Sequence, residues 1–207
     1  MTIYKAIGFD WGGVLNGKPG KFFGEAVSNE IGVTPEQYGV AYFHHNMKFN
    51  SGAIDSQELW TLVVTELGCP NEPELVRRIL EISRAANADN VNEDVLLLVD
   101  LLRQKGYKVG LITNNSTDKA DLMRQARLDE HFDAFDVSVE TGLVKPDPAA
   151  FNHLADELGV KVSELIFIDD TPYSLSTARE TGFTPILFDS YEQLVNDLAR
   201  LGIDVAL

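Results

Sequence analysis

Hydrophobic residues change their spacing along this chain. A continuous apolar run over residues 4–9 ends at Asp10 and predicts a buried first strand. After a cluster of turn-forming residues at 16–20, apolar positions recur every three or four residues from 22 to about 88, which is typical of amphipathic helices. Thr34 begins one of these helices, because a proline follows it and a glutamine stands three residues later, as in a capping box. This part of the chain therefore predicts one strand followed by a helical insert.

From residue 92 onward the pattern alternates between helix and strand. Strands are predicted at residues 107–113, 135–139, 165–168 and 185–188, and helices between 92 and 106 and at 116–127, 147–158, 172–181 and 191–201. Such alternation implies a parallel sheet with helices on both faces, joined by right-handed crossovers. We therefore expect an α/β fold: a three-layer α/β/α Rossmann-like core (residues 1–17 and 89–207) and a small α-helical cap (residues 18–88).

Polar side chains stand where three of the predicted strands end. They are Asp10 after the first strand, Thr113 and Asn114 after the second, and Asp169 and Asp170 after a later one. In open α/β sheets, ligands bind outside the carboxyl ends of the strands. Lys145, in the segment Gly-Leu-Val-Lys-Pro-Asp, adds a cation to this set. Three carboxylates, one hydroxyl and one ammonium suit a divalent cation together with a phosphate.

The charge of the chain narrows the classes of partner. Seventeen basic residues stand against 32 acidic ones, which gives a net charge of −15. Nucleic acids and anionic membranes bind basic patches, so we expect neither as a partner. A phosphate site in such a chain has to supply its own local positive charge. The sequence leaves open whether the protein is a monomer or a dimer.

Two further observations bear on the compartment. Cys69 is the only cysteine, so no intramolecular disulfide can form, and a cytoplasmic location is expected. No apolar stretch approaches the roughly 20 residues that a membrane-spanning helix needs.

Together, the four polar segments resemble the motifs of the haloacid dehalogenase-like hydrolases, a superfamily made mostly of phosphatases. The chain is similar to small members whose first motif reads Asp-x-Gly-Gly/Asn-Val, including a bacterial sugar-1-phosphatase group, and whose helical cap lies between the first and second motifs. The resemblance implies that Asp10 is a nucleophile that forms an aspartyl-phosphate. It also implies that Thr113 and Asn114 hold the transferring phosphoryl group, and that Lys145 neutralises Asp10 and the phosphate oxygens.

The same resemblance implies a Mg²⁺ site. Its ligands would be Asp10, Asp169, Asp170 and the backbone carbonyl of Gly12, in line with the preference of Mg²⁺ for hard oxygen ligands. Gly12, with the glycine after it, would leave backbone amides accessible to phosphate oxygens. The expected substrate is a small phosphate monoester, such as a sugar phosphate or a similar metabolite.

One position departs from the pattern of the family. Most of its phosphatases carry a second aspartate, a general acid and base, two residues after the nucleophile, where this chain has Gly12. A positioned acid or base accelerates a reaction by roughly 10²–10⁴-fold. The chain could therefore be a slow phosphatase, a phosphatase with an acid from the cap, or a non-catalytic binding protein. A hydrolytic 2-haloacid dehalogenase is a further alternative, although retention of Asp169 and Asp170 favours phosphoryl transfer.

The predicted cap offers further polar candidates. His44, His45 and Lys48 could contact substrate or supply the missing acid, or they could simply form a solvated helix face. Trp11, next to the nucleophile, either packs in the core or shapes the entrance to the site.

Overall fold

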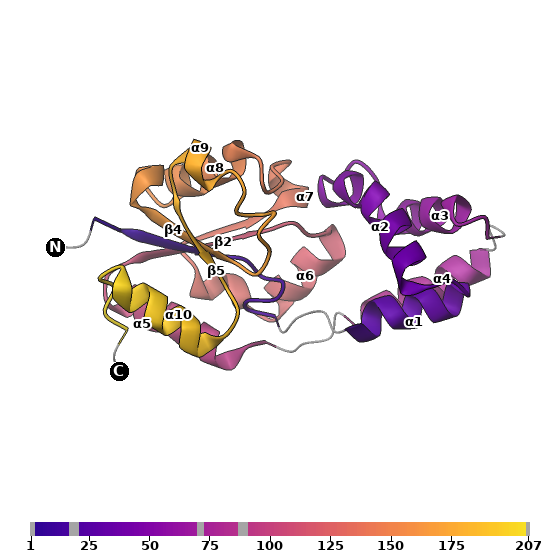
Figure 1. The fold of residues 1–207 in the computed structure, drawn as a ribbon, viewed down its shortest axis with the longest axis horizontal. Coiled ribbons are helices and arrows are strands. Elements are labelled where there is room, and N and C mark those ends of the chain that lie inside the picture. The colour runs from indigo at the N-terminus through magenta and orange to yellow at the C-terminus, as the bar shows by residue number, and fades with distance from the viewer. Residues whose placement is uncertain (1–2, 17–20, 70–72, 87–90, 206–207) are drawn as a thin grey trace.

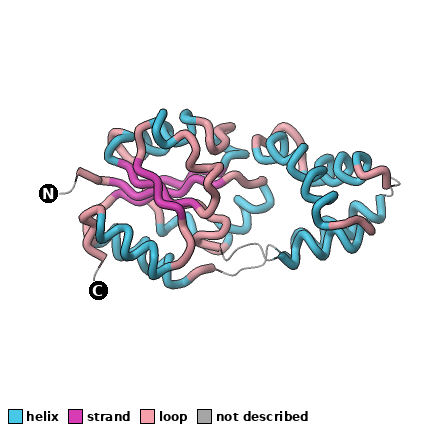
Figure 2. The backbone as a smooth tube through the Cα atoms, viewed as in Figure 1, coloured by secondary structure: helices cyan, strands magenta, loops and turns pink. Residues whose placement is uncertain are grey.

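The computed structural model describes residues 3–16, 21–69, 73–86 and 91–205. Five parallel strands form one sheet in the order β3-β2-β1-β4-β5 (Figure 2). The strands are β1 (Ala6–Phe9), β2 (Lys108–Thr113), β3 (Ala134–Val137), β4 (Leu165–Asp169) and β5 (Thr184–Leu187). Phe9 at the end of β1 pairs with Leu111 on one side and Ile168 on the other, so β1 is the central strand.

Helices cover both faces of this sheet. On one face lie α5 (Glu93–Gln104), α6 (Thr117–Gln125) and α10 (Tyr191–Arg200), which share a buried cluster with β1. The other face is covered by α8 (Pro148–Glu157) and the short α9 (Ala178–Thr181), packed around Phe151 and Phe167. Figure 1 shows α5 and α10 below the sheet and α8 and α9 above it. The predicted three-layer α/β core is confirmed.

Four helices form a separate group with its own core. They are α1 (Lys21–Ile31), α2 (Pro35–Asn50), α3 (Ser56–Glu66) and α4 (Pro73–Ala86). Their shared cluster includes Leu59, Trp60 and Ile79, all at most 2% exposed. Figure 1 shows this group beside the sheet layers, on the side away from both chain ends. The helical insert is thus present.

Local signals fix where the helices of this group begin. The amide of Gln37 donates to the Thr34 hydroxyl and the Thr34 amide donates back to the Gln37 side chain, which confirms the predicted capping box. Asp55 caps α3 in the same manner, through the amide of Glu58.

The described residues of the α/β core on either side of the helical group contact each other. Asn16 forms an antiparallel bridge with Val91, and the amide of Asn92 donates to the Leu15 carbonyl (2.7 Å). The predicted boundaries, after residues 17 and 88, fall in the stretches 17–20 and 87–90, outside the described residues. They remain predictions.

Two local predictions were wrong. The helix expected over 172–181 is limited to α9, because Thr171 turns back on Asp169 with both its amide and its hydroxyl, and turns follow. The strand expected over 135–139 ends at Val137, where α7 (Ser138–Thr141) begins. Ser138 is drawn out of the strand because its hydroxyl donates to the carbonyl of Asn50 at the end of α2.

The search for a membrane-spanning segment covered the described residues. Within these, no helix is long and apolar enough to cross a membrane.

Candidate active site

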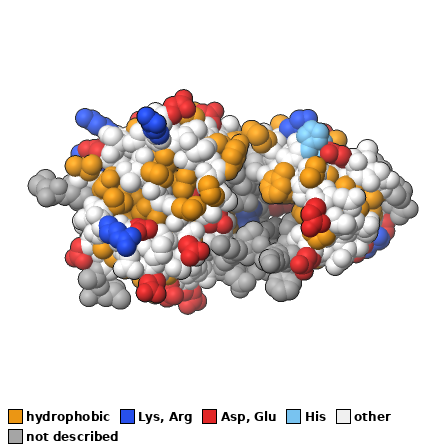
Figure 3. All heavy atoms as spheres, viewed as in Figure 1, with side chains coloured by type: hydrophobic (Ala, Val, Ile, Leu, Met, Phe, Trp, Pro, Cys, Tyr) orange, Lys and Arg blue, Asp and Glu red, His pale blue; other side chains and the backbone are white. Residues whose placement is uncertain are grey.

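The carboxyl ends of neighbouring strands converge on one cavity. Asp10 follows β1, Thr113 ends β2 and Asp170 follows β4. All three line a cavity of about 680 Å³, whose opposite wall is formed by α2. Figure 3 shows the hollow between the α/β core and the helical group, with hydrophobic side chains on both sides of it. The strand-end residues predicted to act together are therefore close in space.

Lys145 is the centre of the charged network. Its ammonium lies 2.9 Å from Asp10 Oδ1 and 2.6 Å from Asp169 Oδ2, and the residue is 3% exposed. Burial acts to lower the pKa of Lys145, but the two carboxylates outweigh that effect and raise its pKa above the usual value. Lys145 therefore remains charged and holds the two acids together.

Asn114 and Asn115 position the neighbouring groups. The Asn114 side chain donates to the Lys145 carbonyl and accepts from the Lys145 amide, both at 2.9 Å. Asn115 Nδ2 donates to Thr113 Oγ1 (2.6 Å). Because the Thr113 oxygen serves as an acceptor there, its own proton can be donated to a ligand in the cavity.

Asp10 is held in one orientation by two contacts. Its Oδ1 accepts from the Trp11 amide (2.7 Å) and from Lys145. Burial raises the pKa of the Asp10 carboxyl to about 7; the Lys145 ammonium opposes the rise and the Asp169 charge adds to it. Additional positive charge next to Asp10 would favour its ionised, nucleophilic form.

The three acids fit a divalent cation. Carboxylate oxygens of Asp10, Asp169 and Asp170 lie within 4.8 Å of one another. Three carboxylates against the single charge of Lys145 leave two negative charges, which a divalent cation would balance. Gly13 passes so close that a Cβ there would lie 2.2 Å from Asp170 Oδ2, and its φ is +72°, so only glycine lets the chain pass here. The hard oxygen donors of the three carboxylates suit Mg²⁺.

The acids differ in how their oxygens are used. Asp169 is fully buried, with Oδ2 bound to Lys145 and Oδ1 accepting from the amide and hydroxyl of Thr171 (2.9 and 2.7 Å). Asp10 and Asp170 line the cavity, whereas Asp169 lies behind them. Thr171 is a positioning residue that the sequence analysis did not single out, although it directly follows the acid pair.

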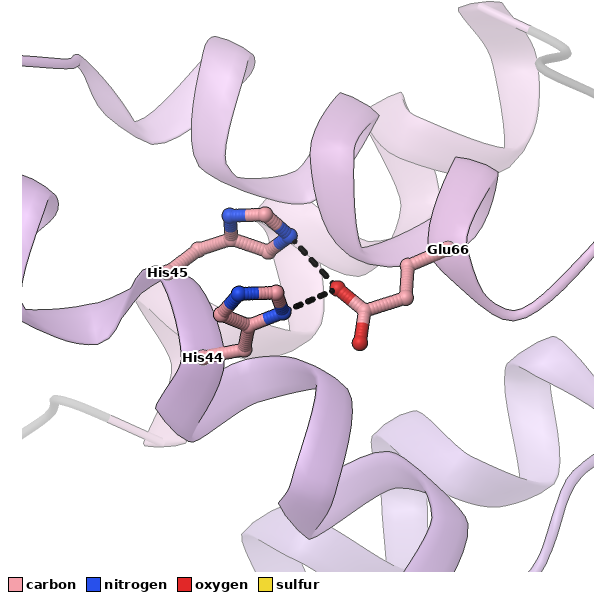
Figure 4. A group of neighbouring side chains, drawn as sticks. All are labelled: His44, His45 and Glu66. Carbon is pink, nitrogen blue, oxygen red and sulfur yellow. Dashed lines mark hydrogen bonds and ion pairs between the residues drawn. The ribbon is translucent and has the colours of Figure 1, made fainter.

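Four predicted residues lie away from the cavity lining. His44 and His45 bind Glu66 at the end of α3, through Nδ1 (3.0 Å) and Nε2 (2.7 Å) respectively (Figure 4). Lys48 is exposed on α2. Trp11 is 3% exposed and packs in the main core below the Lys119 ammonium, so it reaches the site only through its backbone.

A different face of α2 meets the cavity. Phe43, Asn46, Met47 and Asn50 line it from this helix, opposite Asp10. Their spacing of three and four residues is the signal that could have identified this face, but the adjacent histidines drew the prediction to the neighbouring one.

Gly12 lines the cavity beside Asp10. A Cβ placed on Gly12 would find only Asp10 Oδ2, at 4.0 Å. A Cβ at this position would therefore meet no close contact, unlike one at Gly13.

Comparisons with known proteins agree with this arrangement. The sequence profile described as haloacid dehalogenase-like hydrolase matches residues 4–182. Bifunctional epoxide hydrolase 2 of Mus musculus is 32% identical over 124 residues, which cover 58% of this chain and 22% of that protein. A phosphatase of Mycobacterium tuberculosis is 34% identical over 143 residues, 66% of this chain and 64% of that protein. The chain thus spans about a fifth of the former protein and just under two thirds of the latter.

A solved structure shows the same fold. It is a HAD family enzyme from Bacteroides thetaiotaomicron in complex with magnesium and inorganic phosphate, 21% identical to this chain. The two align with a TM-score of 0.66 over 92% of this chain and 98% of the other.

Proposed function

The chain belongs to the haloacid dehalogenase-like hydrolases, and from this membership we propose that it is a magnesium-dependent phosphatase that hydrolyses small phosphate monoesters through an aspartyl-phosphate at Asp10. One observation carries the proposal: the buried Lys145 ammonium contacts both Asp10 and Asp169, with Asp170 completing a three-acid cluster at the cavity. The phosphatase of Mycobacterium tuberculosis and the magnesium- and phosphate-bound bacterial enzyme support the same assignment.

Mg²⁺ would be held by Asp10, Asp170 and the Gly12 carbonyl, with Asp169 bound directly or through water. When bound, the ion supplies positive charge that offsets the repulsion between Asp10 and a phosphate dianion. The engagement of both Asp169 oxygens by Lys145 and Thr171 favours Asp170 as the more direct ligand.

The chain's own residues would carry the two steps. A carboxylate oxygen of Asp10 attacks phosphorus, and the bond from phosphorus to the leaving oxygen breaks. Lys145 and the Thr113 hydroxyl stabilise the phosphoryl oxygens, helped by the backbone amides after Asp10. Water then attacks the phosphorus of the aspartyl-phosphate, the bond from phosphorus to the Asp10 oxygen breaks, and inorganic phosphate leaves as the Asp10 carboxylate is regenerated.

The group α1–α4 would act as a cap. It places α2 across the cavity from Asp10, and polar contacts join it to the core: Ser138 to Asn50, and Ser56 to Asp118 (3.3 Å). We propose that this cap, residues 18–88 by the sequence pattern, shields the reacting groups from water and contacts the leaving group.

The second candidate is a binding protein that keeps the fold but does not hydrolyse its ligand. Gly12 favours it, because no acid stands beside Asp10 at that position. The intact network of Asp10, Lys145 and Asp169 speaks against it, and the three-acid cluster speaks against a metal-independent dehalogenase.

The test is phosphate release from a panel of phosphate monoesters, with Mg²⁺ and with EDTA. We expect release that needs Mg²⁺ and disappears in Asp10→Asn. Asp94→Asn, an exposed acid in the first turn of α5, is the matched control and should behave like the wild type. Mg²⁺ binding without any turnover would instead favour the binding protein, and release of halide from 2-haloacids without metal would favour the dehalogenase.

A further inference from the structure

The exposed side chains that α2 contributes to the cavity are apolar, while Asn46 and Asn50 on the same wall are half-buried and buried. Phe43 and Met47 lie one turn apart on the helix and are 70% and 61% exposed, and both line the cavity. Tyr173, from the loop after β4, is 66% exposed and lines the same cavity. Large apolar side chains gathered at a cavity are typical of a site that binds an apolar or aromatic group.

Two amides at the sheet edge of the cavity are engaged within the protein. Asn114 is bound to the backbone of Lys145, and Asn115 to Thr113. A sugar would need several hydrogen-bonding partners. On the α2 wall the exposed side chains are Phe43 and Met47, whereas Asn50 is 8% exposed, so the surface open to a ligand there is mainly carbon. The lining therefore favours an apolar body over the sugar that the sequence resemblance suggested.

No carboxyl group remains among the described lining residues to protonate the leaving group. Among the described lining residues, those with ionisable side chains are Asp10, Lys145, Asp170 and Tyr173. Asp10 is the nucleophile, Asp170 belongs to the metal set, and the Lys145 ammonium is bound by two carboxylates. Gly12, where an acid would stand, has no side chain. Tyr173 is the one remaining donor to test.

From these two observations, and resting on the proposed phosphatase function, we infer that the substrate is an aryl, enol or acyl phosphate with an apolar body. Such a leaving group needs no protonation. As Asp10 forms its bond to phosphorus, the electron pair of the breaking bond stays on the leaving oxygen, which departs as a phenolate, enolate or carboxylate. Solvent supplies any later proton.

The test compares phosphate esters that have similar aromatic bodies but leaving groups of different acidity. With Mg²⁺ present, we expect kcat/KM to fall from p-nitrophenyl to phenyl to benzyl phosphate, the last being lower than the first by roughly 10²-fold or more. Gly12→Asp should raise kcat/KM for benzyl phosphate more than for p-nitrophenyl phosphate, because it supplies a proton donor at a position where a Cβ meets no close contact. Gly12→Asn, whose side chain has the shape of aspartate but no acidic proton, should not raise it.

Two variants test the wall. Phe43→Ala should raise KM for p-nitrophenyl phosphate and leave that for acetyl phosphate unchanged, while Val40→Ala, exposed on the same helix outside the described lining, should change neither. Equal kcat/KM for phenyl and benzyl phosphate, or a loss of benzyl phosphate turnover in Tyr173→Phe, would overturn the inference but keep the phosphatase. No Mg²⁺-dependent release from p-nitrophenyl or acetyl phosphate would overturn the proposed function itself.

A second observation concerns the histidine pair of α2. His44 Nδ1 and His45 Nε2 both point at the same oxygen, Glu66 Oε2 (Figure 4). The atoms of these three residues that could ligate a metal lie within 4.8 Å of one another. The rings are stacked with centroids 4.8 Å apart, and the His45 side chain is 12% exposed. The other two histidines, His131 and His153, each contact a single carboxylate.

Two imidazoles and a carboxylate are typical ligands of zinc, which also binds sites of three protein ligands and a water. We propose that His44, His45 and Glu66 bind Zn²⁺ or a similar transition-metal ion and so join α2 to α3. Such an ion would stabilise the helical group in proportion to its binding. The site lies outside the cavity lining and is separate from the three acids.

The test is thermal unfolding with and without Zn²⁺, in excess Mg²⁺ so that the acid cluster is occupied. The midpoint should rise with Zn²⁺ in the wild type and in His131→Ala, and the rise should be lost in His44→Ala and in His45→Ala. Equilibrium dialysis should show one Zn²⁺ fewer for the two α2 variants. An equal rise or equal dialysis count in all four proteins would overturn this site.

Discussion

The side chains on the two walls of the cavity differ in how far they are buried. At the sheet edge, Thr113, Lys145 and Asp169 are at most 3% exposed, and each has hydrogen-bond partners. On α2, Phe43 and Met47 are mostly exposed. The sheet edge is thus organised before any ligand arrives, which is what charge stabilisation in a transition state requires. Phe43 and Met47 would become buried only when a ligand fills the cavity.

The largest effect is expected from breaking the sheet-edge network. Lys145→Met leaves Asp10 and Asp169 buried without their counter-charge, so the free energy of unfolding should fall by about 3–5 kcal/mol. Activity should fall roughly 10²–10³-fold. Urea unfolding and p-nitrophenyl phosphate turnover measure the two. Lys5→Met, which removes the exposed pair with Glu164, is the control and should change stability by less than about 1 kcal/mol. Equal effects would contradict the central role of Lys145.

The next effect tests whether the two walls belong to parts that unfold separately. Leu59→Ala should cost about 2–5 kcal/mol in the helical core. The two tryptophans report on each part, Trp60 in the helical group and Trp11 in the sheet core. In variants keeping one tryptophan, we expect the urea midpoint seen by Trp60 to fall more than that seen by Trp11.

Exposed Leu97→Ala on α5 should shift neither midpoint appreciably. If Leu59→Ala moved both midpoints equally, the helical group and the sheet would form one cooperative unit.

A smaller effect is expected at Thr171. Thr171→Val removes the hydroxyl that donates to Asp169 Oδ1 and contacts Ser174, while the backbone bond to Asp169 remains. Stability should fall by about 1 kcal/mol. Because Asp169 would be less firmly oriented, the Mg²⁺ concentration needed for half-maximal turnover should rise. Thr171→Ser, which keeps the hydroxyl, should restore the wild-type value. A Ser variant as poor as Val would rule out this positioning role.

The smallest effect is a pH dependence far from the cavity. The bond to Asp136 raises the pKa of His153 above its usual 6.5. Its stabilisation is therefore present below 6.5 and lost as the pH rises through the higher folded-state pKa. His153→Ala should lower stability at about pH 6 by a few tenths of a kcal/mol, since the side chain is partly exposed. The difference should vanish by about pH 9; a difference that grew with pH would contradict the pairing.

The sheet edge could be predicted because its chemistry coincides with strand ends. Each apolar run that predicted β1, β2 and β4 stops at a polar residue, and parallel strands bring those residues to one edge. Lys145 was included as a cation near these strand ends, but its role came from the resemblance. Its contacts depend on the path of the loop before α8, which sequence spacing does not determine.

The α2 wall could not be predicted in the same way. Helical periodicity shows which residues share a face, but not whether that face meets solvent, the group's own core or another part of the chain. Phe43 and Met47 have the spacing of core residues. However, α2 packs into the core of the helical group through Tyr38 and Ala41, which lie on the neighbouring face of the helix. The turns after Asp169 were not predicted for a related reason. The Thr171 hydroxyl donates to the nearby Asp169 carboxylate, and this local bond competes with the start of a helix.

The bridge between Asn16 and Val91 has a consequence for the ancestry of the chain. Asn16 and Val91 pair on either side of the helical group, and the five strands of the described sheet all lie before Asn16 or after Val91 in the sequence. The helical group is therefore an insertion that a segment of different length and shape could replace without a change in strand order. For this reason we expect the polar groups at the strand ends and the cavity wall on α2 to vary independently of each other.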